Sequence, residues 1–119
     1  MKVFGINTCQ TYKKTLAWFD KHGIDYEAID YRVNPLSSDQ MKEAHEKSGL
    51  DIKAFFNTSG KLYKTYGLKE TYQHMSLEEI YALLSKEPML IKRPLVVGDD
   101  FVFVGFKAST YKDFWHVDA

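Results

Sequence analysis

The sequence predicts a single α/β domain over residues 1–119, with a mixed four-stranded sheet and a helical insert at about residues 36–87. Three observations predict this fold. The beginning of the chain has the pattern strand, helix, strand, and its end has two strands and a helix. The stretch between them carries helix caps and helical periodicity. The chain has 119 residues, 45% of them hydrophobic, which is enough for one buried core and too few for two domains.

The strand–helix–strand half begins with a short apolar run at residues 3–6. Tyr12, Leu16 and Phe19 then recur at i, i+4 and i+7, which places them on one face of an amphipathic helix. Residues 26–31 are rich in aromatic and branched side chains, as is typical of a strand. Because a helix joins the two strands, we expect them to be parallel, with a right-handed connection.

The insert begins with a helix cap. Ser37 is followed by Gln40 three residues later, and Ser76 is followed in the same way by Glu79, so both pairs have the spacing of a capping box. Residues 51–67 read as one or two short helical pieces. After the second box an apolar stripe at helical spacing predicts a longer helix, at Leu77, Ile80, Leu83 and Leu84.

The last part of the chain reads as an antiparallel hairpin and a closing helix. Residues 95–97 and 101–104 are apolar and flank a Gly-Asp-Asp turn. A helix over residues 108–115 would be pinned to the sheet by Phe114 and Trp115. Without the insert the order is βαβ followed by ββα, which is the order of the thioredoxin fold. We therefore expect a thioredoxin-like fold with the insert between its two halves.

Composition excludes several classes of protein. The 16 basic and 16 acidic side chains give a formal net charge of zero, so we expect no direct binding to nucleic acid. A single cysteine allows no internal disulfide, and no apolar run is long enough for a signal peptide or a membrane span. The four histidines show no metal-ligand spacing with the cysteine, so we expect no bound metal or cofactor. We expect a cytoplasmic monomer.

Cys9 is the candidate nucleophile. It directly follows the first expected strand and begins the first expected helix, where free N–H groups and the helix dipole favour a thiolate. Lys13, one turn further on, would add positive charge. The alternative is that Cys9 is a small buried hydrophobic residue, as most free cysteines are.

The usual second thiol of a dithiol site is missing. Tyr12 stands at the position of the second cysteine in a Cys-x-x-Cys pattern. If Cys9 reacts, the thiol that resolves its mixed disulfide must come from outside the chain. We expect that thiol to be a small molecule or another protein.

Four segments, in order along the chain, resemble the arsenate reductase (ArsC)/Spx-like family. They are residues 5–14, 55–63, 89–97 and 104–107. The resemblance implies a thioredoxin-like core with a helical insert and an active site around the first turn. It also implies that Pro94 is the cis-proline of the fold, facing Cys9, and that Arg93 lies beside the thiolate. The alternatives are a surface ion pair for Arg93 and an ordinary trans proline at position 94.

An arginine beside the thiol would lower its pKa and grip an oxyanion or a glutathione carboxylate. We therefore expect Cys9 and Arg93 to be catalytic. The residues expected to contact substrate are Asn7, Thr8, Thr11, Lys13, Asn57, Pro94 and Lys107.

The sequence departs from the arsenate reductases of this family. The resemblance implies that those enzymes use one nucleophilic cysteine and three arginines. Arg93 matches one arginine, Asn57 aligns with another, and the third falls near Phe106 or Lys107. The family's active-site histidine, four residues before the thiol, is Gly5 here. The arsenate pocket is therefore mostly absent from this sequence.

The resemblance implies three functions. The first is a monothiol thiol-disulfide reductase of the glutathione-dependent type, which uses glutathione, a bacillithiol-like thiol or a glutaredoxin-like reductant. The second is an Spx-like regulator that binds the RNA polymerase α subunit, without the Cys-x-x-Cys switch. The third is arsenate reductase proper.

Overall fold

Four short strands form one mixed sheet in the computed structural model, which describes residues 1–118. The strand order is β2-β1-β3-β4. β1 (Lys2–Gly5) pairs in parallel with β2 (Glu27–Asp30) and antiparallel with β3 (Leu95–Val97), which pairs antiparallel with β4 (Val102–Val104). The sheet is mixed, as predicted, and the crossover strands are parallel.

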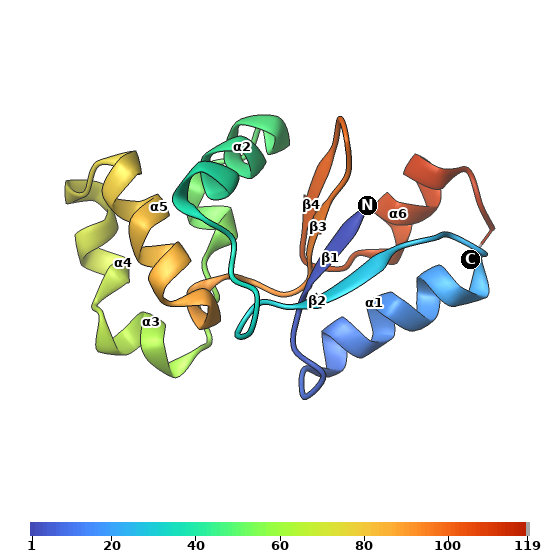
Figure 1. The fold of residues 1–119 in the computed structure, drawn as a ribbon, viewed down its shortest axis with the longest axis horizontal. Coiled ribbons are helices and arrows are strands. Elements are labelled where there is room, and N and C mark those ends of the chain that lie inside the picture. The colour runs from blue at the N-terminus through green and yellow to red at the C-terminus, as the bar shows by residue number, and fades with distance from the viewer. Residues whose placement is uncertain (119) are drawn as a thin grey trace.

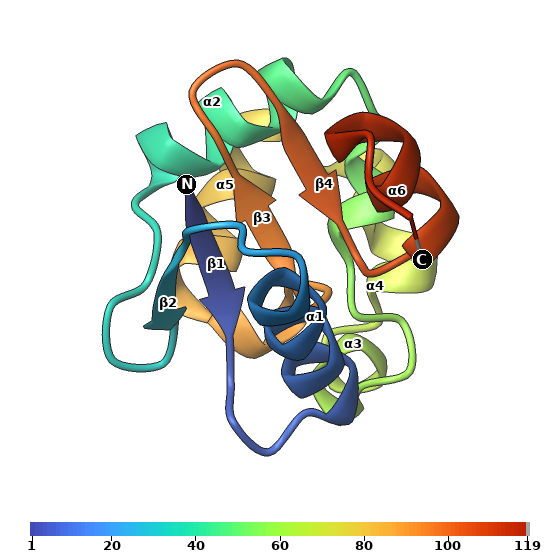
Figure 2. The same cartoon turned by 90° about the vertical axis from the view of Figure 1, so that its right-hand side faces the viewer.

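Two helices cover one face of the sheet, α1 (Gln10–Lys21) and α6 (Ala108–Trp115), as Figures 1 and 2 show. Because successive side chains of a strand point to opposite faces of the sheet, every second strand residue lies beneath these helices. The buried cluster on this face contains Val3, Tyr12, Phe19, Val96 and Tyr111.

The closing helix is held to this face mainly by Tyr111, which is 1% exposed and stacks on Phe19 with ring centroids 5.7 Å apart. Trp115 packs on Phe103 of β4, as expected, with ring centroids 5.7 Å apart, and on Phe19 edge to face at 5.4 Å. Phe114 is 43% exposed, although its ring lies 4.7 Å from that of Phe101. The expectation that Phe114 would anchor the helix is therefore only partly met.

The insert packs against the opposite face of the sheet. Its core is continuous with the strand side chains Phe4, Leu95 and Val102, and with Ile6 just after β1. Its helices are α2 (Ser38–Ser48), α3 (Lys61–Thr65), α4 (Leu68–Thr71) and α5 (Leu77–Lys86), with 3₁₀ turns at Ile52–Phe55, Tyr72–His74 and Pro88–Leu90. No helix within residues 1–118 is long and apolar enough to cross a membrane.

Both predicted capping boxes are present. Ser37 Oγ accepts from the Gln40 N–H at 3.1 Å, and the Gln40 side chain accepts from the Ser37 N–H at 2.9 Å. Ser76 and Glu79 make the same pair of bonds at the start of α5, with the same two distances. These reciprocal bonds satisfy donors that a helix start would otherwise leave free, which fixes where α2 and α5 begin.

A short ladder ties the insert to the segment that precedes β3. Phe56 and Ile91 form an antiparallel bridge, and the Lys92 N–H donates to the Phe55 carbonyl at 2.8 Å. The ladder leads directly into the Arg93–Pro94 peptide bond, which is cis, as the resemblance implied. It thereby brings the insert and residues 92–94 to the same end of the sheet as the start of α1.

Candidate active site

Cys9 is the N-cap residue of α1. Its backbone is extended (φ −88°, ψ 120°), its N–H donates to the Ile6 carbonyl at 3.1 Å, and its carbonyl accepts from the Lys13 N–H at 3.1 Å. The side chain is partly buried. The sulfur therefore lies at the helix start, beside backbone N–H groups without helical partners.

These surroundings favour the thiolate. Burial, the largest single influence, raises the pKa of Cys9, but the Tyr12 N–H, the hydrogen bond and charge of Arg93, and the Thr11 N–H together outweigh it. The net effect is a pKa of the Cys9 thiol below its ordinary value. Cys9 is thus not a buried hydrophobic residue but a partly exposed sulfur held towards its reactive form.

Arg93 is held in place by a buried tyrosine. Its Nη1 donates to the Tyr31 hydroxyl at 3.0 Å, and that hydroxyl donates to the Ile91 carbonyl at 3.1 Å. Tyr31 is 0% exposed. Met89 Sδ, 3.8 Å from the same nitrogen, is a further contact. Arg93 is therefore not a surface ion pair but a half-buried guanidinium fixed beside the sulfur.

A cleft of about 530 Å³ opens over Cys9. It is lined by Cys9, Thr11, Asn57, Ser59, Lys92, Arg93, Val104, Gly105, Phe106 and Lys107. Three of these side chains are cationic and none is acidic. The walls come from both the insert and the sheet half, and the charge suits an anionic ligand.

The cleft gathers some of the residues predicted to contact substrate and leaves others outside. Thr11, Asn57 and Lys107 line it together with the two predicted catalytic residues. The expected contacts that do not line it are Asn7 and Thr8, exposed in the turn before α1, Lys13, exposed on α1, and Pro94, buried. Lys13 does not contribute to the lowered pKa of Cys9 either.

Sequence reasoning missed Tyr31 and, on the cleft wall, Ser59, Lys92, Val104 and Gly105. A buried tyrosine hydroxyl needs a partner, but only the fold reveals that the partner is 62 residues away. Gly105 has φ +81°, a conformation that favours glycine, and its N–H donates to the Pro94 carbonyl at 2.8 Å.

The loop at Asn57 forms a rigid part of the wall. The Asn57 side chain donates to the Met89 carbonyl at 3.4 Å and accepts from the Ser59 hydroxyl at 3.3 Å. Its N–H donates to the Leu90 carbonyl at 2.7 Å. Asn57 therefore orders the loop with its amide, whereas an arginine at this position would carry a charge.

No resolving thiol is present at the start of α1. Tyr12 is 2% exposed, and its hydroxyl donates to the Val3 carbonyl at 3.2 Å. Residue 12 thus belongs to the core and points away from the cleft. Among residues 1–118 no group of three or more His, Cys, Asp or Glu side chains is placed to hold a metal ion.

Comparison with known proteins agrees with this architecture. The ArsC family model matches residues 4–114. The uncharacterized protein YusI of Bacillus subtilis is 43% identical over 107 residues, which cover 90% of this chain and 91% of that protein. The global transcriptional regulator Spx of the same organism is 23% identical over 107 residues, which cover 90% of this chain and 80% of that protein.

A solved structure shares this fold. The crystal structure of a possible arsenate reductase from Streptococcus mutans superimposes with a TM-score of 0.87 at 37% identity, and 95% of each chain is covered. The family match spans the Cys9 loop, the insert and the Arg93–Pro94 segment. The chain belongs to the ArsC family, with the thioredoxin-like α/β fold that its members share.

Proposed function

We propose that the protein is a monothiol thiol-disulfide reductase in which Cys9 is the nucleophile. The observation that carries this proposal is the position of Cys9, at the start of α1 and beside Arg93 in an open cleft, with its pKa lowered. A thiolate near neutral pH is the attacking species in disulfide exchange. A free thiol of this kind suits a reducing compartment such as the cytoplasm.

The reaction has two exchange steps. The Cys9 thiolate attacks one sulfur of a disulfide, so a new S–S bond forms and the other half leaves as a thiolate. The thiolate of an external small thiol, such as glutathione or a bacillithiol-like compound, then attacks the sulfur bound to Cys9. Cys9 is released as a thiolate, and the second half leaves joined to the small thiol. The chain needs no second cysteine for this cycle.

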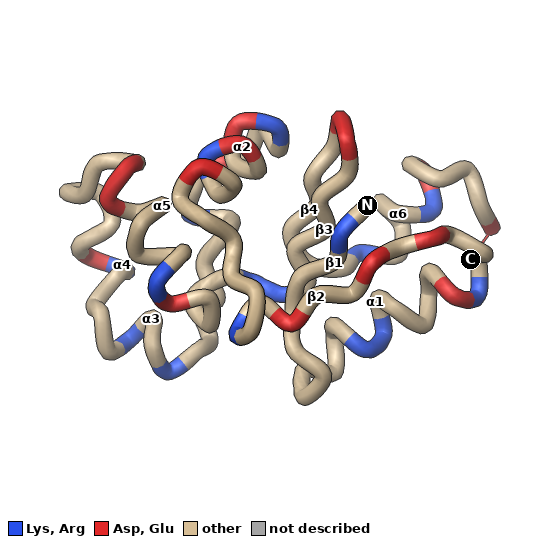
Figure 3. The backbone as a smooth tube through the Cα atoms, in the orientation of Figure 1, with Lys and Arg blue, Asp and Glu red and all other residues tan. Residues whose placement is uncertain are grey.

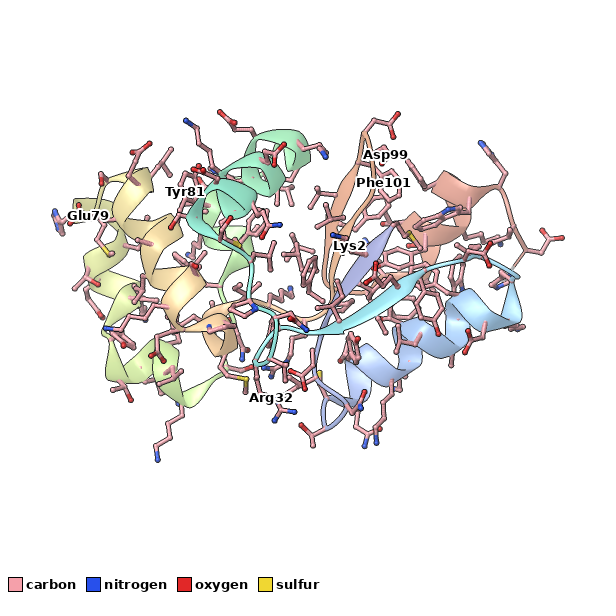
Figure 4. The ribbon with its side chains drawn as sticks, in the orientation of Figure 1. Lys2, Arg32, Glu79, Tyr81, Asp99 and Phe101 are labelled. Atoms are coloured by element: carbon pink, nitrogen blue, oxygen red, sulfur yellow. The ribbon has the colours of Figure 1, made fainter. Side chains whose placement is uncertain are left out.

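The cleft supports disulfide chemistry better than arsenate reduction. Arg93 is the one arginine that lines it, and Arg32 is bound to Asp30 at 2.8 Å in the turn after β2 (Figure 4). Lys92 and Lys107 add charge to the wall but lack the planar fork of donors that grips a tetrahedral oxyanion. The carboxylate of a small thiol can pair with a lysine ammonium group, which does not need the planar arrangement of donors that an oxyanion such as arsenate requires.

The proposal is tested by the pH dependence of Cys9 alkylation with iodoacetamide. We expect the rate to rise with an inflection below about 8.5, the ordinary thiol pKa. Arg93→Gln should move the inflection upward, and Arg32→Gln, which removes the other arginine, should leave it in place. An inflection at or above the ordinary value in the unmodified protein contradicts the proposal.

A second function is favoured by the similarity to Spx, which extends over 90% of this chain. In this candidate the protein is a regulator that binds the RNA polymerase α subunit through its surface, without chemistry at Cys9. Pull-down with the C-terminal domain of that subunit tests it. Binding that survives Cys9→Ala would support the regulator, and absence of binding would contradict it.

A further inference from the structure

A second cleft, of about 610 Å³, lies in the helical insert. Its lining residues are Lys53, Thr58, Tyr63, Lys64, Gly67, Lys69 and Glu70. Three lysines and one glutamate thus line it. Within residues 1–118 the one ion pair is Arg32–Asp30, so Glu70 neutralises none of the three lysines by direct contact. The cleft therefore has an excess of positive charge.

One loop forms part of both clefts. Asn57 and Ser59 line the cleft over Cys9, and Thr58, between them, lines the cleft in the insert. The loop is ordered by the Asn57 side chain, and Gly60 packs so closely on it that an added Cβ would lie 2.7 Å from Asn57 Nδ2. The two clefts are therefore neighbours that share residues 57–59 as part of their walls.

Charge is segregated on this neutral protein. Residues 52–69 contain four lysines and no acidic residue. In Figure 3 the tip of the β3–β4 hairpin, where Figure 4 labels Asp99, is red, α2 carries both red and blue, and α3 carries blue without red. Both clefts are therefore lined by more basic than acidic side chains, although the net charge of the protein is zero.

We propose that the insert cleft binds an acidic segment of a protein substrate whose disulfide lies at Cys9. This inference rests on the proposed function and adds the substrate class. The cleft over Cys9 is large enough to hold a small thiol by itself. A ligand that also reaches Lys53, Lys64 and Lys69 in the second cleft must therefore be larger than a small thiol. Carboxylates are the groups that three unpaired ammonium ions on such a wall attract.

The test uses two peptides, each with one cysteine activated as a 2-pyridyl disulfide. One peptide carries Asp and Glu on both sides of its cysteine, and the other carries Asn and Gln at the same positions. The Cys9 thiolate attacks the peptide sulfur, a Cys9–peptide disulfide forms, and 2-thiopyridone leaves and is measured by its absorbance. We expect the acidic peptide to react about tenfold faster at low ionic strength, with an advantage that salt reduces.

The substitutions Lys53→Gln, Lys64→Gln and Lys69→Gln, combined in one variant, should remove most of that advantage. The rate with the neutral peptide should not change. A matched variant removes the same charge from α1, α2 and α6 by Lys21→Gln, Lys42→Gln and Lys112→Gln. It should keep the preference, because none of these lysines lines either cleft.

Three outcomes would overturn the inference. They are equal rates for the two peptides, a preference that persists in the insert-cleft variant, and an equal loss of preference in the matched variant. If instead neither peptide reacts faster with Cys9 than with an ordinary thiol, the proposed function itself fails. The neutral peptide therefore distinguishes failure of the substrate assignment from failure of the chemistry.

Discussion

Gly5 and Tyr12 share one space in the core. A Cβ built on Gly5 would overlap Cδ1, Cε1 and Cγ of the Tyr12 ring, which lies over the end of β1. The Tyr12 ring therefore needs the volume that a side chain at residue 5 would fill.

The shared space predicts a large cost for a small substitution. Gly5→Ala should lower the free energy of unfolding by about 2 kcal/mol, because the ring must move within a packed core. Urea unfolding measures the change. In the Tyr12→Leu background the same substitution should cost much less, and an equal cost in both backgrounds would show that the overlap is not its cause.

The hydrogen bond between Tyr31 and Arg93 predicts that Tyr31 influences the pKa of Cys9. Tyr31→Phe removes the acceptor that fixes the guanidinium at 3.0 Å, so the pKa of Cys9 should rise and its alkylation inflection should move to higher pH. Tyr81→Phe is the control, because it removes a hydrogen bond to His45 in the insert. Each variant should lose about 1 kcal/mol of stability, but Tyr81→Phe should leave the inflection unchanged.

The lowered pKa of Cys9 also predicts how stability depends on pH. Because the thiol ionises more readily in the folded chain than in the unfolded one, its contribution is present above the unfolded-state pKa and is lost as pH falls through the folded-state pKa. The difference in unfolding free energy between the unmodified protein and Cys9→Ser should therefore grow from about pH 6 to about pH 9. Urea titrations at several pH values check this, and a constant or shrinking difference would contradict it.

The capping box of α5 predicts a stability change that leaves the chemistry intact. Ser76→Ala should cost about 1 kcal/mol, because the Glu79 N–H loses its acceptor. Ser109→Ala, at an exposed position on α6, should cost much less. The rate of Cys9 alkylation should be the same in both, and a changed rate in Ser76→Ala would show that the start of α5 is coupled to the cleft.

The sequence predicted best what local chemistry decides. The Ser37 and Ser76 caps depend on residues three positions away, and both were found as predicted. The place of Cys9 at a helix start follows from a strand, a turn and an amphipathic helix in series. The closing helix, predicted over residues 108–115, has these bounds in the structure.

The resemblance implied that Arg93 lies beside Cys9, but the contact that holds Arg93 there could not be predicted from the sequence. Tyr31 meets Arg93 only because β2 and the segment before β3 end at the same side of the sheet. The stripe on α5 was partly wrong, since Leu77 is 43% exposed and Tyr81 is buried in its place. Tyr81 reaches the core because α5 packs on α2, where its hydroxyl meets His45, and periodicity alone does not include that neighbour.

The wall of the cleft over Cys9 belongs partly to the insert and partly to the β3–β4 half, with Asn57 and Ser59 on one side and Phe106 and Lys107 on the other. Any molecule that fills it bridges segments about fifty residues apart in the chain. A bound molecule should then slow the hydrogen exchange of backbone amides on both sides of the cleft at once. Such paired protection would reveal a bound molecule before its chemical identity is known.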